Sequence, residues 1–192
     1  MQYTSKIEKA IKVATYAHRN QKRKGGDIPY ISHPFSVMII LSEYTNDEDI
    51  IIAGILHDLL EDTDTKEYSK MDIENDFGKR VLTIIQGVSE DKNKYSDIIN
   101  EKDTWKNRKI EYLKHLSEAS EAAILVSSAD KLHNLFTTIE GIKIVGEKAW
   151  DIFNSSKEEQ IWFYKEFASI LNTRLPNHPL VKRVIDSVAE LK

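Results

Sequence analysis

The residues best suited to chemistry in this 192-residue chain lie in the sequence HDLLED at 57–62. Its four ionisable side chains are His57, Asp58, Glu61 and Asp62. An apolar run at 50–56 precedes them, and residues three and four apart share a helix face, so the four crowd one end of a buried helix. Carboxylates so placed repel one another and are costly to bury unless a cation neutralises them. The sequence therefore predicts a divalent metal site, with a solvated helix end as the alternative.

A second polar feature lies within the apolar sequence ILVSSADKLHNLFTTI at 124–139. Asp130, Asn134 and Thr137 recur at the spacing of one helix face. A buried carboxylate must be paired, either by a metal ion or by a structural hydrogen bond, and the spacing leaves both open.

His33 is a third candidate ligand, because it stands where a loop meets a helix, directly before Pro34. Taken by itself, such a histidine is more often a helix cap or a surface residue than a metal ligand. Two imidazoles and two carboxylates come together if the site is built from His33, His57, Asp58 and Asp130. This donor set suits Mn²⁺, Fe²⁺, Zn²⁺ or Ni²⁺ and leaves positions for water and substrate. Such a site lowers the pKa of bound water and polarises a phosphoryl oxygen, which indicates metal-assisted hydrolysis.

The elements that must position these side chains are helices, because apolar residues recur at helical spacing and strand-type alternation is essentially absent. Helices are expected at about 5–20, 34–44, 49–60, 70–77, 79–88, 105–116, 118–139, 157–171 and 180–191. Ser32 or His33 is expected to cap the second of them. Loops or breaks are expected at 21–33, 45–48, 89–104 and 141–147. The predicted fold is all-α, a single compact domain over 1–192 with the metal site between buried helices.

Composition excludes several classes of protein. The chain has no cysteine, which excludes disulfides, thiolate zinc sites, iron–sulfur clusters and cysteine nucleophiles. A net charge of −4 argues against non-specific nucleic-acid binding. No secretory signal is visible, and the longest apolar run is far shorter than the roughly 20 residues that span a bilayer. We expect a cytoplasmic protein with no nucleic-acid or membrane partner, and a homo-oligomer stays open.

Four segments resemble, in order, the hydrolase domain of Rel/Spo-type alarmone enzymes, which are HD-domain metal-dependent phosphohydrolases. The segments are ATYAHRNQKRKGGDIPYISHP, AGILHDLLEDTDT, FGKRVLTIIQGVSEDK and SADKLHNLFTT. The single-domain members, the small alarmone hydrolases, are the most similar in length. The resemblance implies an all-α fold and removal of pyrophosphate from the 3′ position of guanosine tetra- or pentaphosphate, usually with Mn²⁺.

The resemblance also implies roles for individual residues. The metal ligands would be His33, His57, Asp58 and Asp130. Water activation and proton transfer would fall to Glu61 and Asp62, which suits acids placed just beyond the ligands. The nucleotide would be held by Arg23, Lys24, Tyr30, Asn134 and Thr137. A planar guanidinium stacks on a base, whereas an ammonium group meets phosphate.

This chain departs from the family pattern in places. Its loop RKGGDIPY is one residue longer than in the long enzymes, and Gly25 stands where a substrate-binding hydroxyl is expected. Where the long enzymes usually have Thr-Lys, the chain has Ser-Glu-Asp at 89–91. A solvated helix face, rather than phosphate contact, is favoured for Lys106, Arg108 and Lys109. Structural or surface roles are expected for His18, His115, His133 and His178.

Two other functions stay open on the sequence. One is an HD phosphohydrolase for another nucleotide, either a deoxynucleoside monophosphate or the 2′-phosphate of NADPH. The other is a non-catalytic binding protein with a vestigial HD site, against which the intact ligand set and the Glu-Asp pair both argue.

Overall fold

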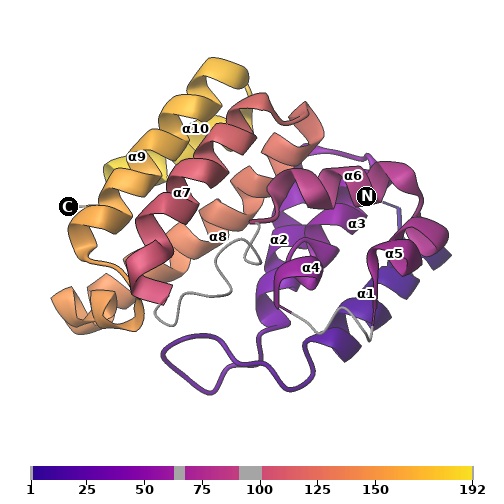
Figure 1. Cartoon of the computed structure of the whole chain (residues 1–192), viewed down its shortest axis with the longest axis horizontal. Helices are drawn as coiled ribbons and strands as arrows, with labels where there is room; N and C mark the ends of the chain where they lie inside the picture. Colours follow the sequence, from indigo (N-terminus) through magenta and orange to yellow (C-terminus); the bar gives the residue numbers. More distant parts are fainter. Residues whose placement is uncertain (1, 63–67, 91–100, 192) are drawn as a thin grey trace.

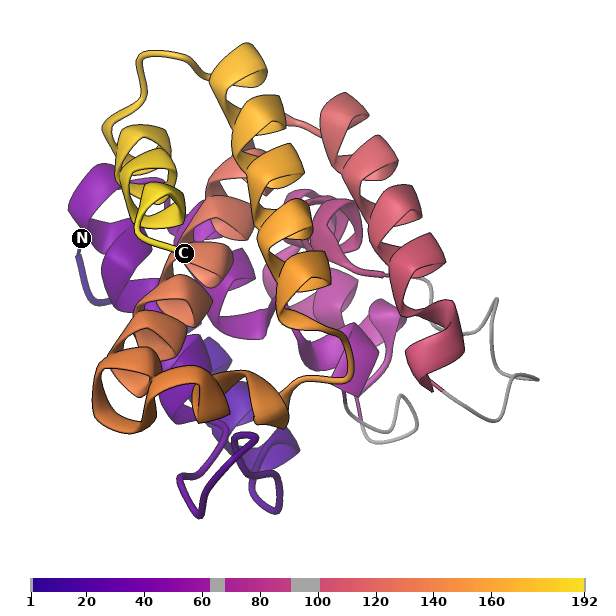
Figure 2. The ribbon, with the colours of Figure 1, turned by 90° about the vertical axis from the view of Figure 1, so that its left-hand side faces the viewer.

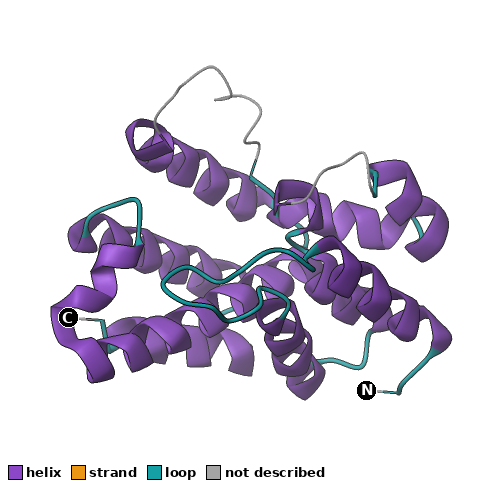
Figure 3. Cartoon of the chain, turned by 90° about the horizontal axis from the view of Figure 1, so that it is seen from below, coloured by secondary structure: helices purple, strands orange, loops and turns teal. Residues whose placement is uncertain are grey.

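The computed structural model describes residues 2–62, 68–90 and 101–191, apart from the side chains at 62 and 101–103. Within these residues the named elements are all helices, accompanied by an isolated antiparallel bridge between Lys22 and Pro29 (Figure 3). The predicted all-α fold is confirmed. No helix among the described residues is long and apolar enough to cross a membrane.

The helices of the first half of the chain are α1 (Ser5–Ala17), α2 (Ser32–Tyr44), α3 (Glu48–Leu56), α4 (Leu59–Asp62), α5 (Lys70–Phe77) and α6 (Lys79–Val88). Those of the second half are α7 (Glu101–Glu118), α8 (Glu121–Val145), the 3₁₀ helix η2 (Gly146–Ile152), α9 (Lys157–Arg174) and α10 (Pro179–Ala189). In Figure 1, α7, α9 and α10 lie on the left and α1, α5 and α6 on the right, with α2 and α8 between them.

Helix α3 is the centre of the molecule, because all of its residues from 50 to 56 are buried. Asp47 begins the helix by accepting hydrogen bonds from the N–H groups of Asp49 and Ile50. Helix α3 packs against α1, α2, α6 and α8. The close approach of α2 depends on Gly54, since a Cβ there would lie 2.2 Å from Cδ1 of Leu41.

Helix α8 connects the two sides of the molecule, because it contacts α2, α3 and α6 as well as α9 and α10. Ser120 caps it by accepting from the N–H of Ala123. Helices α7 and α9 run side by side (Figure 2). Their contact is aromatic, with the Phe163 ring 6.3 Å from that of Trp105 and 6.1 Å from that of Tyr112. These contacts hold α7 over the same region that α2, α3 and α8 build.

Several predicted boundaries were wrong at the ends of the early helices. Helix α1 ends at Ala17, three residues early, and Nδ1 of the next residue, His18, donates to Oε1 of Gln21 at 2.6 Å. The residue that caps α2 is Ile31, so neither Ser32 nor His33 is the cap. His33 instead lies inside the first turn, where its side chain faces the core and is 1% exposed.

Two predicted loops in the second half are partly helical. Helix α7 begins at Glu101 within the predicted loop 89–104, and burial of Thr104 and Trp105 explains why tertiary contacts favour helix there. Helix α8 continues through Gly141 to Val145, although a break was predicted at 141–147. Gly141 lies against η2, where a Cβ would make an ordinary contact of 3.5 Å with Ala149, so this glycine neither ends the helix nor is required by the packing.

Candidate metal centre and active site

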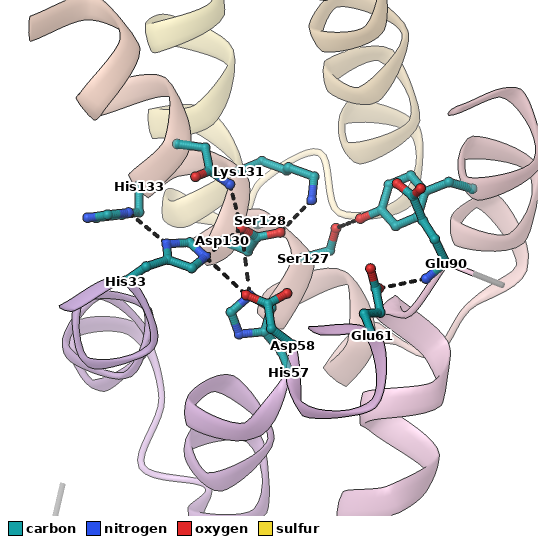
Figure 4. A network of polar contacts seen from close by, with 12 residues as sticks. His33, His57, Asp58, Glu61, Glu90, Ser127, Ser128, Asp130, Lys131 and His133 are labelled. Atoms are coloured by element: carbon teal, nitrogen blue, oxygen red, sulfur yellow. Dashed lines mark hydrogen bonds and ion pairs between the residues drawn. The ribbon is translucent and has the colours of Figure 1, made fainter. Parts of the chain in front are cut away.

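Three parts of the fold bring the four predicted metal ligands together (Figure 4). Helix α2 carries His33, the junction between α3 and α4 carries His57 and Asp58, and the middle of α8 carries Asp130. Both imidazoles and Asp130 are buried, at 1%, 3% and 6% exposed. Since α3 and α8 are core helices, the cluster sits where the fold is most firmly packed.

The predicted helix at 49–60 is interrupted at the site. Helix α3 ends at Leu56 and α4 starts at Leu59. Nδ1 of His57 donates to the carbonyl of Gly54 at 2.8 Å, and that carbonyl would accept from the N–H of residue 58 in a continuous helix. The imidazole therefore takes the carbonyl of Gly54 that would otherwise continue the hydrogen bonding of α3. The helix ends there, and His57 and Asp58 turn toward α8.

The donor atoms lie at the spacing that one bound ion requires. Nε2 of His57 lies 3.0 Å from Oδ2 of Asp58 and 3.7 Å from Oδ1 of Asp130. Nε2 of His33 lies 3.5 and 3.2 Å from the same two oxygens. Ligand atoms each about 2.0–2.2 Å from a common ion fall at such separations. His33, His57 and Asp58 also form a group whose ligand atoms all lie within 4.8 Å of one another.

One atom of the cluster indicates that a cation would suit it. Nε2 of His57 is buried and has no hydrogen-bond partner among the described residues. Because Nδ1 carries the proton donated to Gly54, Nε2 presents a lone pair toward two carboxylates. That arrangement is repulsive until a cation lies between the groups. The mixed nitrogen and oxygen donor set suits a divalent transition metal.

The pKa shifts of His57 and Asp58 arise from the same close placement of imidazoles and carboxylates. Burial alone would raise the pKa of Asp58, but the adjacent His57 outweighs it and holds that pKa well below its usual range. Burial alone would lower the pKa of His57, but Asp58 and Asp130 outweigh it and raise that pKa. The surplus of negative charge that draws a proton to His57 would also attract a divalent cation.

Side chains around the ligands fix both carboxylates. Oδ2 of Asp58 accepts from the hydroxyl of Tyr30 at 2.6 Å. Oδ1 of Asp130 accepts from Nδ2 of Asn134 at 2.7 Å, while its Oδ2 pairs with Lys131. Tyr30 and Asn134 were predicted to contact substrate, and the structure shows that both also hold a predicted metal ligand.

The predicted base-binding arginine is joined to this network. Nη2 of Arg23 donates to Oδ1 of Asn134 at 2.9 Å, and its guanidinium lies 5.5 Å from the centre of the Tyr30 ring. The loop that carries Arg23 closes on itself through N–H donation from Arg23 to Ile28 and from Tyr30 to Gln21. The other two predicted nucleotide contacts, Lys24 and Thr137, are exposed, and no contact between them and the cluster is found within the described residues.

Glu61 faces a buried group of charges next to the cluster. Its Oε1 accepts from the backbone N–H of Glu90 at 2.6 Å, and the Glu90 carboxylate pairs with Arg108 and Lys109 of α7. The prediction that Arg108 and Lys109 form a solvated face was wrong, because their side chains are only 13% and 17% exposed. Lys106 is exposed as predicted. The side chain of Asp62 lies outside the described residues.

One residue of the site was missed by the sequence reasoning. His133, expected to be structural or at the surface, has its Nδ1 2.8 Å from Nδ1 of His33. His133 follows Asp130 by three residues, so the helical spacing that singled out Asn134 also contained the signal for His133.

Comparison with known proteins identifies the class to which this fold and site belong. The profile of the HD domain matches residues 10–155, which covers all four predicted ligands. The chain belongs to the HD-domain family.

Individual proteins show which members of the HD-domain family this chain is similar to. The chain is 39% identical over 132 residues to a GTP pyrophosphokinase of Streptomyces coelicolor, a match covering 68% of the chain but only 14% of that longer protein. It is 36% identical over 135 residues to guanosine-3′,5′-bis(diphosphate) 3′-pyrophosphohydrolase MESH1 of Danio rerio, covering 69% of the chain and 68% of that protein. Its fold is similar to a solved metazoan ortholog of SpoT, with a TM-score of 0.75 and 24% identity over 98% of this chain and 96% of the other.

Proposed function

We propose that this protein is a metal-dependent pyrophosphohydrolase that converts guanosine tetra- or pentaphosphate to GDP or GTP by releasing pyrophosphate from the 3′ position. The observation that carries the proposal is a buried cluster in an HD-domain fold, where the Nε2 atoms of His33 and His57 both face the carboxylates of Asp58 and Asp130. The substrate is supported by the Danio rerio relative, whose name states this reaction.

In this proposal the ion is held by His33, His57, Asp58 and Asp130. We propose Mn²⁺ as that ion, because imidazole and carboxylate ligands together suit it. The chemistry supplied by such an ion is a lowered pKa for water and polarisation of a phosphoryl oxygen. Tyr30 and Asn134 orient the two carboxylates, through their bonds to Asp58 and Asp130.

Proton transfer is assigned to Glu61, with Asp62 as the second acid. The N–H of Glu90 fixes one carboxylate oxygen of Glu61, and a carboxylate held in this way is suited to accept a proton from water. Hydrolysis places the water oxygen on phosphorus, breaks the bond between phosphorus and the ribose 3′ oxygen, and delivers one proton to that oxygen. The sum is guanosine tetraphosphate plus water giving GDP plus pyrophosphate.

Nucleotide binding is assigned to the loop at 21–31 and to α8. Arg23 would stack its planar guanidinium on the guanine base and Lys24 would meet phosphate. Asn134, Thr137 and Tyr30 would contact the nucleoside. We further propose that the chain acts as one hydrolase domain in the cytoplasm, without nucleic-acid or membrane partners, and that self-association is compatible with this function.

The experiment is incubation of the protein with guanosine tetraphosphate and Mn²⁺, with and without a chelator, followed by anion-exchange separation of the products. We expect GDP and pyrophosphate in equal amounts, and no products with the chelator present. Asp58→Asn should abolish turnover, because it removes a ligand charge with little change in shape. Asp186→Asn is the matched control, since that exposed carboxylate pairs with Lys182 on the surface of α10.

Other outcomes would redirect the assignment. Metal binding without turnover of guanosine tetraphosphate would contradict the proposed substrate, and release of orthophosphate from NADPH or a deoxynucleoside monophosphate would identify the alternative. A protein that neither binds Mn²⁺ nor turns over any of these nucleotides would favour the non-catalytic binding protein.

A further inference from the structure

The two predicted histidine ligands are held in place by different kinds of partner. His57 donates from Nδ1 to a backbone carbonyl of its own helix, that of Gly54, at 2.8 Å. Among the residues that the structure describes, no such carbonyl lies at Nδ1 of His33. Its partner there is Nδ1 of His133, at 2.8 Å, with the two rings 4.9 Å apart (Figure 4).

A contact between two ring nitrogens at this distance requires one proton between them, so one imidazole donates and the other accepts. Nε2 of His33 faces Oδ1 of Asp130 at 3.2 Å and Oδ2 of Asp58 at 3.5 Å, among the predicted ligand atoms. A ligating nitrogen carries no proton, so neutral His33 must carry its proton on Nδ1 and donate it. His133 must then accept at Nδ1 and carry its own proton on Nε2.

His133 reaches this position because it lies on α8 one helical turn after Asp130. The same helix therefore supplies a predicted ligand and the group that orients a ligand from α2. His33 is 1% exposed, so the imidazole of His133, and not bulk solvent, is the group that meets its Nδ1.

We propose that His133 is a positioning residue of the metal centre, which fixes the tautomer and ring orientation of His33 and thereby sets the affinity for the ion. The inference rests on the proposed metal site. Hydrogen-bond partners of ligating histidines change metal affinity by about 10–100-fold when removed. The partner of His57 belongs to the backbone, so the partner of His33 is the one that a side-chain substitution can remove.

The test is titration of metal-free protein with Mn²⁺, with free Mn²⁺ followed by electron paramagnetic resonance. His133→Ala should raise the dissociation constant about 10–100-fold. His133→Asn should restore most of the affinity, because its Oδ1 can accept where Nδ1 did. His115→Ala is the matched control, since His115 is an exposed histidine of α7, and it should bind as the wild type does.

The possible results distinguish a failure of the proposed metal site from a failure of the role inferred for His133. Wild-type protein that fails to bind Mn²⁺ would overturn the metal site itself. Wild-type binding with an unchanged constant for His133→Ala, or equal losses for the Ala and Asn variants, would overturn the role of His133 alone. Circular dichroism establishes that each variant is folded.

A second measurement needs no variant. Nitrogen-15 spectra of the histidine rings in wild-type protein should show the His133 proton on Nε2 and the His33 proton on Nδ1. The opposite pair of tautomers would contradict the assignment, because Nε2 of His33 would then be blocked by a proton.

Discussion

Asp130 serves two purposes because its two carboxylate oxygens face different partners. Oδ1 lies near both imidazoles and accepts from Asn134, while Oδ2 pairs with Lys131. Asn134 in turn accepts from Arg23 through its amide oxygen. A single amide therefore connects the loop proposed to bind the base with a proposed metal ligand, and its two ends have opposite hydrogen-bonding character.

A first prediction concerns Arg23→Lys. An ammonium group cannot both stack on a base and reach Asn134 as the planar guanidinium does, so the substitution is not conservative. We expect the KM for guanosine tetraphosphate to rise about tenfold, equivalent to about 1.4 kcal/mol, with kcat changed less than about twofold. Steady-state kinetics with saturating Mn²⁺ measures both constants.

Arg19→Lys is the matched control for this prediction, because Arg19 also lies over a tyrosine ring, that of Tyr16 at 4.0 Å, but outside the site. It should leave both constants unchanged. A loss of kcat with unchanged KM in the Arg23 variant would contradict a role in ground-state binding.

At the scale of elements, the site depends on how closely α2 approaches α3. His33 and His57 come from these two helices, and their rings lie 5.1 Å apart. Gly54 permits this approach, since the space beside it is filled by Leu41, with Val37 next to it. Any side chain at 54 must push α2 away or displace a fully buried leucine.

A second prediction follows for Gly54→Ala. Alanine favours helix by up to about 1 kcal/mol over glycine, but the new methyl group overpacks the interface at a cost of about 1–3 kcal/mol. We expect a net loss of about 1 kcal/mol in the free energy of unfolding, measured by urea denaturation, together with weaker Mn²⁺ binding.

Gly141→Ala provides the comparison, because a Cβ there makes an ordinary contact of 3.5 Å with Ala149. It should be neutral or stabilising and leave metal binding intact. Equal stability of the two variants would contradict this prediction, because it would mean that the α2–α3 interface can accommodate an added methyl group at residue 54.

At the scale of the whole molecule, α6, α7 and α8 meet in a buried charge network beside the site. Glu90, just after α6, pairs with Arg108 and Lys109 of α7, and Lys131 of α8 lies close enough to lower its pKa further. Burial alone would raise the pKa of Glu90, but these cations outweigh it and the net shift is downward. Burial lowers the pKa of Lys109, which makes an intact partner important.

A third prediction is a pH-dependent cost for Glu90→Gln. Because the pKa of Glu90 is depressed in the folded state, its contribution is present above its ordinary value of 4.5 and is lost as pH falls through the folded pKa. At neutral pH we expect a loss of about 3 kcal/mol, the lower end for a broken buried ion pair, since Lys109 keeps some exposure.

Urea denaturation at neutral pH and below pH 4 checks this prediction, and the gap between wild type and variant should narrow at the acidic end. Asp186→Asn, which breaks an exposed pair with Lys182, should cost less than about 1 kcal/mol. A gap that is constant with pH would show that Glu90 acts through packing and not through charge.

The helical class and the four proposed ligands could both be predicted from the amino-acid sequence alone. Apolar residues at helical spacing are a local signal, and acidic residues directly after an apolar run can be recognised in the sequence whatever fold the chain adopts. The end of α3 was less predictable, because it depends on His57 taking the carbonyl of Gly54.

The polar side chains that reach the site from other helices could not be predicted without the folded structure. His133 meets His33 across 100 positions of sequence, and Arg108 and Lys109 are buried because Glu90 lies against them. Sequence spacing relates residues on one helix, whereas these contacts join helices whose relative placement is fixed by the whole core. For the same reason the sequence predicted a solvated face for Arg108 and Lys109 of α7, and the packing of α6 and α9 around α7 was needed to correct it.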